Sequence, residues 1–223
     1  MTLKVIRTDW LATKSQHWRL LIMAAIVVVF ALMEMSMIII PISAYMAIAF
    51  SMNAFAVEEK GKLDHLYLSL PLSRKSIVRG RFTFMILLLV IALAICGAIV
   101  VATSPHLQFG EIYTDVEPKS IALMCSLGFA FSGFINLSMY PVMFRMGYEK
   151  GKIFGFYIPV FVIALIFGLT AAFAATRIEI LLGWLLYWLA NPLKVCGIML
   201  AVGTVLFYLS YRLSLWLYSK RDL

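Results

Sequence analysis

Three groups of residues in this 223-residue chain have types and spacings that could do chemistry. Glu58 and Glu59 form an acidic pair of the kind some intramembrane proteases use in a Glu-Glu-x-x-x-Arg pattern, but the sixth residue here is Leu63. Residues 147–153 contain a Gly-Lys step, yet a phosphate-binding loop needs one more intervening residue and a Ser or Thr where Ile153 stands. The histidines, His17, His65 and His106, lack metal-ligand spacing. We therefore expect no catalytic residue, no metal and no bound cofactor in this chain.

The composition points instead to an integral membrane protein. Hydrophobic residues make up 63% of the chain and charged residues 13%, whereas soluble domains have about 45–50% and about 25%. The first apolar run begins after residue 19 and lacks a small-residue cleavage site, so we expect it to remain as a helix rather than to be removed as a signal peptide.

Apolar stretches long enough to cross a bilayer predict six membrane-spanning helices. Four stretches are uninterrupted: residues 82–102, 120–144, 153–176 and 195–211, the last continuing to 218 with Arg212 reaching toward the membrane surface. Residues 20–57 are too long for one span and contain Glu34, so we expect a tight hairpin of two helices that turns between residues 34 and 43. Pro41 should start or kink the second of these helices. The prediction is an all-α membrane protein with a single domain, residues 1–223.

The distribution of basic residues predicts the orientation of the chain. Of the nineteen Lys and Arg residues, all but Lys119, Arg177 and Lys194 fall on the side that holds both termini. Because cytoplasmic loops collect Lys and Arg, both termini should be cytoplasmic. Residues 1–19 predict a basic amphipathic helix on the inner leaflet, and residues 178–191 predict an interfacial helix on the outer side.

Residues 58–81, which we call the charged loop, are the most clearly patterned segment outside the spans. Leu63, Leu66, Tyr67 and Leu70 are spaced to form one apolar stripe on a helix. Pro71 should end this helix, and Ser73 is placed to N-cap the helix that leads into the third span. The stripe could lie against the membrane or against a soluble partner, and the pattern alone favours neither.

Three segments of the chain resemble ABC-2-type transporter permeases. Residues 58–78 resemble the cytoplasmic loop of these permeases, and residues 7–14 resemble their N-terminal helix, with Thr8 where a basic residue is expected. Residues 140–152 resemble their fourth-to-fifth-span loop, with its Gly-x-Glu-Lys-x-basic pattern. The similar subgroup is the small six-span bacterial permeases related to bacitracin-resistance and phenol-soluble-modulin exporters.

The resemblance implies one half of a permease in a bacterial cell membrane. Two such chains, identical or paired with a sister, would form the path, and each would bind a soluble ATPase that holds ATP and Mg²⁺. Residues 58–70 would form the coupling helix that docks in the ATPase. The implied docking residues are Glu58, Glu59, Gly61, Leu63, Leu66, Tyr67, Leu70, Pro71, Ser73 and Arg74, with Lys75 also at the rim. A second cytoplasmic contact would involve Arg145, Gly147, Glu149 and Lys150.

The implied cargo is amphipathic or antimicrobial peptides or hydrophobic compounds, moved outward, with no nucleic acid as a partner. Two alternatives remain, a secondary transporter and an intramembrane enzyme. A secondary transporter should carry ionisable residues at mid-membrane, for which Glu34 is the only acidic candidate. Gly147, Gly151 and Gly155 are spaced by four, which predicts either close helix packing, a flexible loop or a contact with a partner.

Overall fold

The computed structural model describes Trp10, Ile22, residues 25–29, 36–60, 73–103, 106–109, 112–115, 118–157, Phe161, Leu165, Gly168 and residues 191–220. In chain order, the described elements are the helices α3 (Ser36–Ser51), α4 (Asn53–Lys60) and α6 (Arg74–Thr103), the strands β1 (His106–Phe109) and β2 (Ile112–Asp115), the helix α7 (Pro118–Lys152), the π-helix η1 (Ile153–Tyr157) and the helix α10 (Pro192–Ser219).

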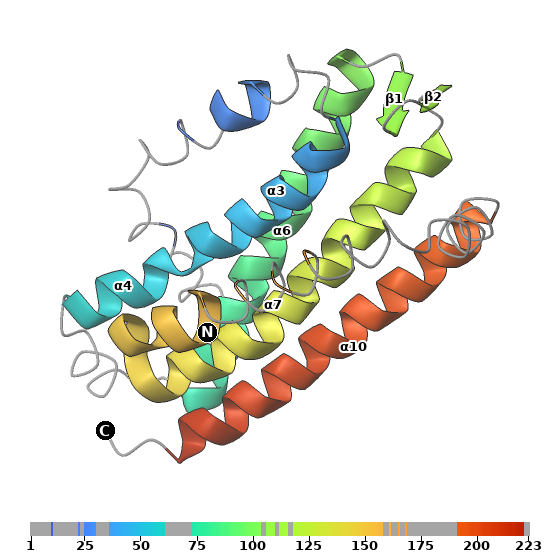
Figure 1. Ribbon diagram of the computed structural model, residues 1–223. Coiled ribbons are helices and arrows are strands. Elements are labelled where there is room, and N and C mark those ends of the chain that lie inside the picture. Colours follow the sequence, from blue (N-terminus) through green and yellow to red (C-terminus); the bar gives the residue numbers. More distant parts are fainter. Residues whose placement is uncertain are drawn as a thin grey trace.

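Four helical segments in this part of the chain are long and apolar enough to cross a membrane: Ile40–Glu59, Arg74–Ala102, Ile121–Gly155 and Pro192–Ser219. They run side by side as one bundle (Figure 1). These helices confirm the spans predicted over residues 82–102, 120–144 and 195–218. Most residues of the predicted first and fifth spans, and of the helices predicted for residues 1–19 and 178–191, lie outside the described part of the chain.

The second span differs in detail from the sequence prediction. Its helix α3 has already begun at Ser36, so Pro41 lies inside the helix, which excludes only the first of the two roles predicted for it, that of starting the helix. The helix is then interrupted at Met52, between the end of α3 and the start of α4. The sequence analysis did not predict this interruption, because the residues on both sides of Met52, including the polar Ser51 and Asn53, contain neither Gly nor Pro.

The loop predicted between the third and fourth spans contains a small β-hairpin. Strands β1 and β2 pair antiparallel, with His106 opposite Asp115 and Phe109 opposite Ile112. β-branched and aromatic residues in β2 favour this structure, and only residues 110 and 111 connect the strands. The prediction of an all-α protein therefore holds for the described spans but misses this two-stranded sheet.

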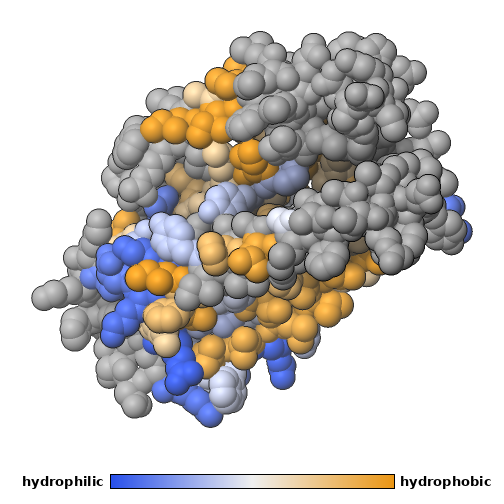
Figure 2. All heavy atoms as spheres, viewed as in Figure 1, coloured by the Kyte–Doolittle hydropathy of each residue, from blue (hydrophilic) through white to orange (hydrophobic). Residues whose placement is uncertain are grey.

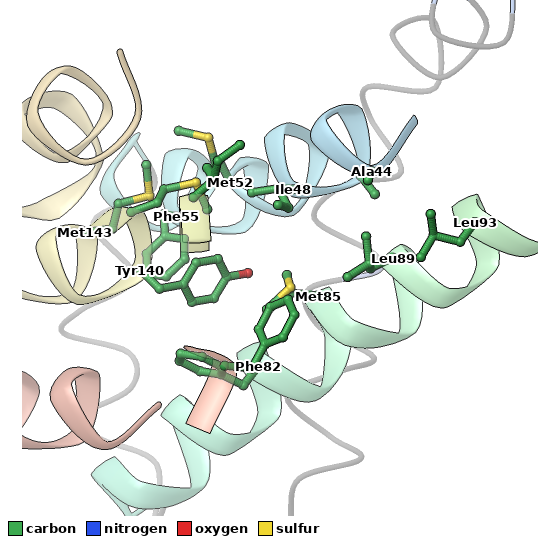
Figure 3. Close-up of a cluster of buried hydrophobic side chains, with 14 of the residues drawn as sticks. Ala44, Ile48, Met52, Phe55, Phe82, Met85, Leu89, Leu93, Tyr140 and Met143 are labelled. Atoms are coloured by element: carbon green, nitrogen blue, oxygen red, sulfur yellow. The ribbon is translucent and has the colours of Figure 1, made fainter. Parts of the chain in front are cut away.

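The core of the bundle lies where α3 and α4 meet α6 and α7. Ile48, Phe55, Met85, Leu89 and Tyr140 point toward one another there and are buried (Figure 3). In contrast, large apolar side chains such as those of Val90, Ile95 and Val205 are exposed on the outside of the bundle. Such outward-facing apolar side chains suit a lipid environment, in which a helix satisfies its own backbone hydrogen bonds.

Candidate functional site

The candidate site is the end of the bundle where α4 ends, α6 begins, α7 bends and α10 ends, which we call the basic end. Among the residues that Figure 2 colours, hydrophilic ones gather at this end of the molecule, and hydrophobic ones cover much of the remaining coloured surface. Both described ends of the charged loop, residues 58–60 and 73–81, lie here (Figure 1). Six predicted docking residues fall outside the described residues: Gly61, Leu63, Leu66, Tyr67, Leu70 and Pro71.

A buried ion pair links the two ends of the charged loop. Nη2 of Arg81, on α6, lies 2.5 Å from Oε2 of Glu58, on α4, and these side chains are only 3% and 10% exposed. The Arg81 guanidinium also lies 4.1 Å from the ring centroid of Phe55, and Phe144 lies beyond it at 5.8 Å. A planar guanidinium suits this setting, because it can pair with a carboxylate and stack on an aromatic ring together.

The neighbouring carboxylate, that of Glu59, holds a bend in α7. The bend is at Gly147, whose φ of 79° and ψ of −176° belong to a region that essentially only glycine adopts. The backbone N–H groups of Tyr148 and Glu149 both donate to Oε2 of Glu59, the latter over 3.1 Å. Free N–H groups at the start of a helical segment favour a carboxylate at this position. Glu59 therefore ties the end of α4 to the bend of α7.

After the bend, the chain folds back against α7. A Cβ atom added to Gly151 would lie 3.0 Å from Cα of Met143, and one added to Gly155 would lie 3.0 Å from Cα of Met139. Glycines allow helical segments to approach this closely. Of the alternatives for the row of glycines spaced by four, close helix packing is the one the structure supports at Gly151 and Gly155.

Ser73 and Arg74 organise the start of α6. The N–H of Ser76 donates to Oγ of Ser73 over 3.2 Å, which confirms the predicted N-cap. Nη1 of Arg74 donates to the carbonyl oxygens of Tyr218 and Ser219, over 3.3 and 3.1 Å. These carbonyls end α10, where a cation is favoured by the helix dipole. Arg74 thus joins the start of α6 to the end of α10.

An aromatic cluster supports these polar links from inside the bundle, and sequence reasoning missed it. Its rings come from α4, α6, α7 and α10: Phe55, Phe82, Tyr140, Phe144, Tyr211 and Tyr218. Several ring pairs meet edge to face, with centroids 4.9 to 5.5 Å apart, a favourable arrangement for aromatic rings. The hydroxyl of Tyr140 donates to Oγ of Ser51 over 3.0 Å.

The predicted second contact remains partly exposed. Arg145, Glu149 and Lys150 have exposed side chains near the bend, and Glu149 pairs with Lys152 over 2.9 Å. Exposed pairs of this kind contribute little to stability. Because the three side chains are exposed, they are accessible to a partner. Gly147 instead serves the bend itself. No three His, Cys, Asp or Glu side chains among the described residues are grouped to hold a metal ion.

Taken together, the spans and the polar links at one end define a multi-span helical membrane protein. The two ends of its charged loop pair with each other and also contact α7 and α10. A family model described as ABC-2 family transporter protein matches residues 4–219, nearly the whole chain. The chain therefore belongs to the ABC-2 transporter family, whose members are the membrane-spanning permease components of ABC transporters. No curated protein and no solved structure matched the chain.

Proposed function

We propose that this chain is the permease subunit of an ABC exporter and that its charged loop couples the spans to a separate ATPase subunit. The family match supports a permease. The observation that carries the coupling role is the pair of contacts that hold the charged loop to the bundle. The Glu58–Arg81 pair joins the two ends of the loop, and Glu59 binds the bend of α7.

This fastening matters because force from a soluble partner can reach the spans only through rigid elements. A loop attached to the spans by chain connectivity alone would absorb a movement of the partner. Here a displacement of residues 61–72 pulls on α4 and α6, which the Glu58–Arg81 pair holds together. Through Glu59, the same displacement also pulls on α7.

The docking surface would be the apolar stripe of the charged loop, with Leu63, Leu66, Tyr67 and Leu70 entering a cleft of the ATPase. Buried apolar side chains supply affinity, and charges at the rim set the register. Arg145, Glu149 and Lys150 are exposed at the same end and would provide the second contact. Two permease chains, identical or sisters, would then be drawn together when the ATPase binds ATP.

The proposed cargo is amphipathic or antimicrobial peptides or hydrophobic compounds, moved outward across a bacterial cell membrane. Acidic residues in the segment between α6 and α7 (Glu111, Asp115 and Glu117) are compatible with cationic amphiphiles. A secondary transporter is less well supported, because in the described parts of the spans the acidic residues Glu58, Glu59 and Glu149 all lie at the basic end. Glu34 lies outside the described residues.

The docking role can be tested by placing charges on the apolar stripe. Leu66→Asp combined with Leu70→Asp should abolish co-purification of the ATPase, because two carboxylates would have to be buried in its cleft. Lys60→Ala with Lys62→Ala is the matched control, since it lowers the net charge by the same amount at positions of the loop outside the apolar stripe. The control should retain the ATPase, and both variants should insert and elute like the unmodified chain.

The same pair of variants tests the cargo. In a strain that depends on this exporter, Leu66→Asp with Leu70→Asp should lower resistance to cationic peptides and bacitracin, whereas the control should not. Unchanged ATPase co-purification in the leucine variant would refute the docking role. Loss of co-purification with unchanged resistance would refute the proposed cargo and leave the docking role intact.

A further inference from the structure

A second polar feature lies at the basic end, beside the contact between Arg74 and the end of α10. It is an open groove of about 530 Å³ between the start of α6 and the end of α10. Its lining includes three cationic side chains, Arg74, Lys75 and Arg212, and no acidic residue among those described. Trp216 lines the same groove and is 53% exposed.

Arg74 accounts for only part of this positive charge. Its guanidinium donates to the last carbonyls of α10 and so balances the negative end of that helix dipole. Within the described residues, neither Lys75 nor Arg212 takes part in an ion pair, and both side chains are exposed. The groove therefore holds at least two cations whose charge nothing in the described chain balances.

The position of Arg212 indicates where the balancing charge would come from. Arg212 lies about two turns, roughly 10 Å, before the end of α10. Its exposed neighbours along the same helix are apolar: Leu209 and Leu213 are 48% and 41% exposed. An arginine among lipid-facing apolar residues extends toward the headgroup region, where its charge can be solvated or paired. The Arg212 side chain accordingly reaches the groove at the end of the helix.

Trp216 also indicates that the groove lies at the membrane–water boundary. Tryptophan is enriched at the membrane–water boundary, where its ring contacts both acyl chains and headgroups. Nζ of Lys220 lies 4.0 Å from the Trp216 ring centroid, which adds another cation beside the groove. The groove thus combines cationic lining residues, an interfacial aromatic ring and an adjoining apolar helix face.

We propose that this groove binds the phosphate headgroup of an anionic phospholipid from the leaflet at the basic end, with its acyl chains along Leu209 and Leu213 of α10. The combination of features fits a lipid better than a soluble anion, because a soluble anion has no use for the apolar helix face. Cationic pockets between spans at this level recognise anionic headgroups. Arg74 and Lys75 are also implied rim residues of the docking loop, but the inference concerns lipid binding by the chain alone and does not depend on how the ATPase is bound.

The test uses the purified full chain in detergent, titrated with dioleoylphosphatidylglycerol or with dioleoylphosphatidylcholine, which has the same acyl chains. Bound lipid is counted by native mass spectrometry. The unmodified chain should prefer the anionic lipid. Arg212→Gln should weaken its binding about fivefold, and Arg212→Gln with Lys75→Gln about 25-fold, with little effect on the zwitterionic lipid. Arg79→Gln with Arg145→Gln removes two exposed cations outside the groove and should leave the preference unchanged.

Two further arms separate the lipid from other sources of negative charge. Millimolar inorganic phosphate should not displace the lipid, and displacement would show that the groove binds free phosphate. Asp222→Asn should not change lipid binding. A preference that appeared only in Asp222→Asn would show that the chain's own residues after α10 fill the groove, and it would overturn the proposal. Equal binding of the two lipids, or an equal loss in the Arg79 and Arg145 control, would also overturn it.

Discussion

The basic end and the middle of the bundle are held together by different forces. At the basic end, charged side chains bridge elements far apart in the sequence: Glu58 pairs with Arg81, Glu59 binds the bend of α7, and Arg74 binds the end of α10. In the middle, α7 and α10 meet through close packing. A Cβ atom added to Gly133 would lie 3.1 Å from the carbonyl oxygen of Gly203.

The difference has a physical reason and a consequence for mechanism. Close packing is the main source of association between helices in lipid, because lipid tails are as apolar as the side chains. Charged links are favoured near the membrane–water boundary, because taking charges out of water costs less free energy there than in the middle of the bundle. A movement delivered at the basic end, as proposed above, would act on directional polar contacts, whereas the middle of the bundle resists separation through its packing.

The largest effect should come from breaking the buried ion pair. Arg81→Met or Glu58→Leu alone leaves a buried charge beside Phe55 without its ion-pair partner, and we expect each to lower the free energy of unfolding by about 3–5 kcal/mol. Titration of the purified protein with sodium dodecyl sulfate in mixed micelles measures this loss. The double variant should lose far less than the sum of the two, because it removes both charges.

The same double-mutant cycle separates the contribution of the ion pair to stability from its proposed role in coupling. If the ion pair serves to transmit movement, the double variant should fold but show weaker stimulation of ATPase activity by cargo. A double variant as unstable as either single variant would show that the surrounding aromatic rings, rather than the charges, depend on these side chains.

A smaller loss should follow from disturbing the middle of the bundle at Gly203. A Cβ atom there would lie 2.6 Å from Cδ1 of Phe129 and 3.2 Å from Cα of Ala130, so α7 and α10 would have to move apart. Gly203→Ala should therefore cost about 1–3 kcal/mol in the same titration. Gly197→Ala on the same helix is the matched control, because nothing lies within 4 Å of its added Cβ. A control variant as unstable as Gly203→Ala would contradict the role of close packing.

Sequence reasoning succeeded where the deciding interactions are local. The Ser73 cap depends on a residue three positions away, and the described spans depend on the length of an apolar run. The glycine spacing of 147–155 also predicted close packing as one of its alternatives. The break at Met52 and the β-hairpin were missed, since neither has a strong local signal in apolar or short segments.

The links of the basic end could not be predicted in the same way, because they depend on the fold. Arg74 and the end of α10 are about 144 residues apart in the sequence, and Glu59 and Tyr148 are 89 residues apart. Glu59 and Gly147 were each predicted to contact a partner, but nothing in the pattern indicated that they contact each other. The aromatic cluster was missed for a related reason, since aromatic residues in a span are equally suited to lipid.

The smallest effect should come from the single neutral hydrogen bond at the boundary between the two regions. The Tyr140 hydroxyl donates to Oγ of Ser51 over 3.0 Å, and Oγ of Ser51 in turn donates to the carbonyl oxygen of Ile48. Tyr140→Phe keeps the ring in its contacts with Phe55 and Phe82 and removes the hydroxyl that makes this bond. Because hydrogen bonds between helices in a membrane contribute about 0.6 kcal/mol on average, we expect a loss of that size. Ser51→Ala should cost a similar amount, and the combined variant little more than either alone. A loss of several kcal/mol in Tyr140→Phe would show that polar bonding, and not packing, also holds the interior next to the basic end.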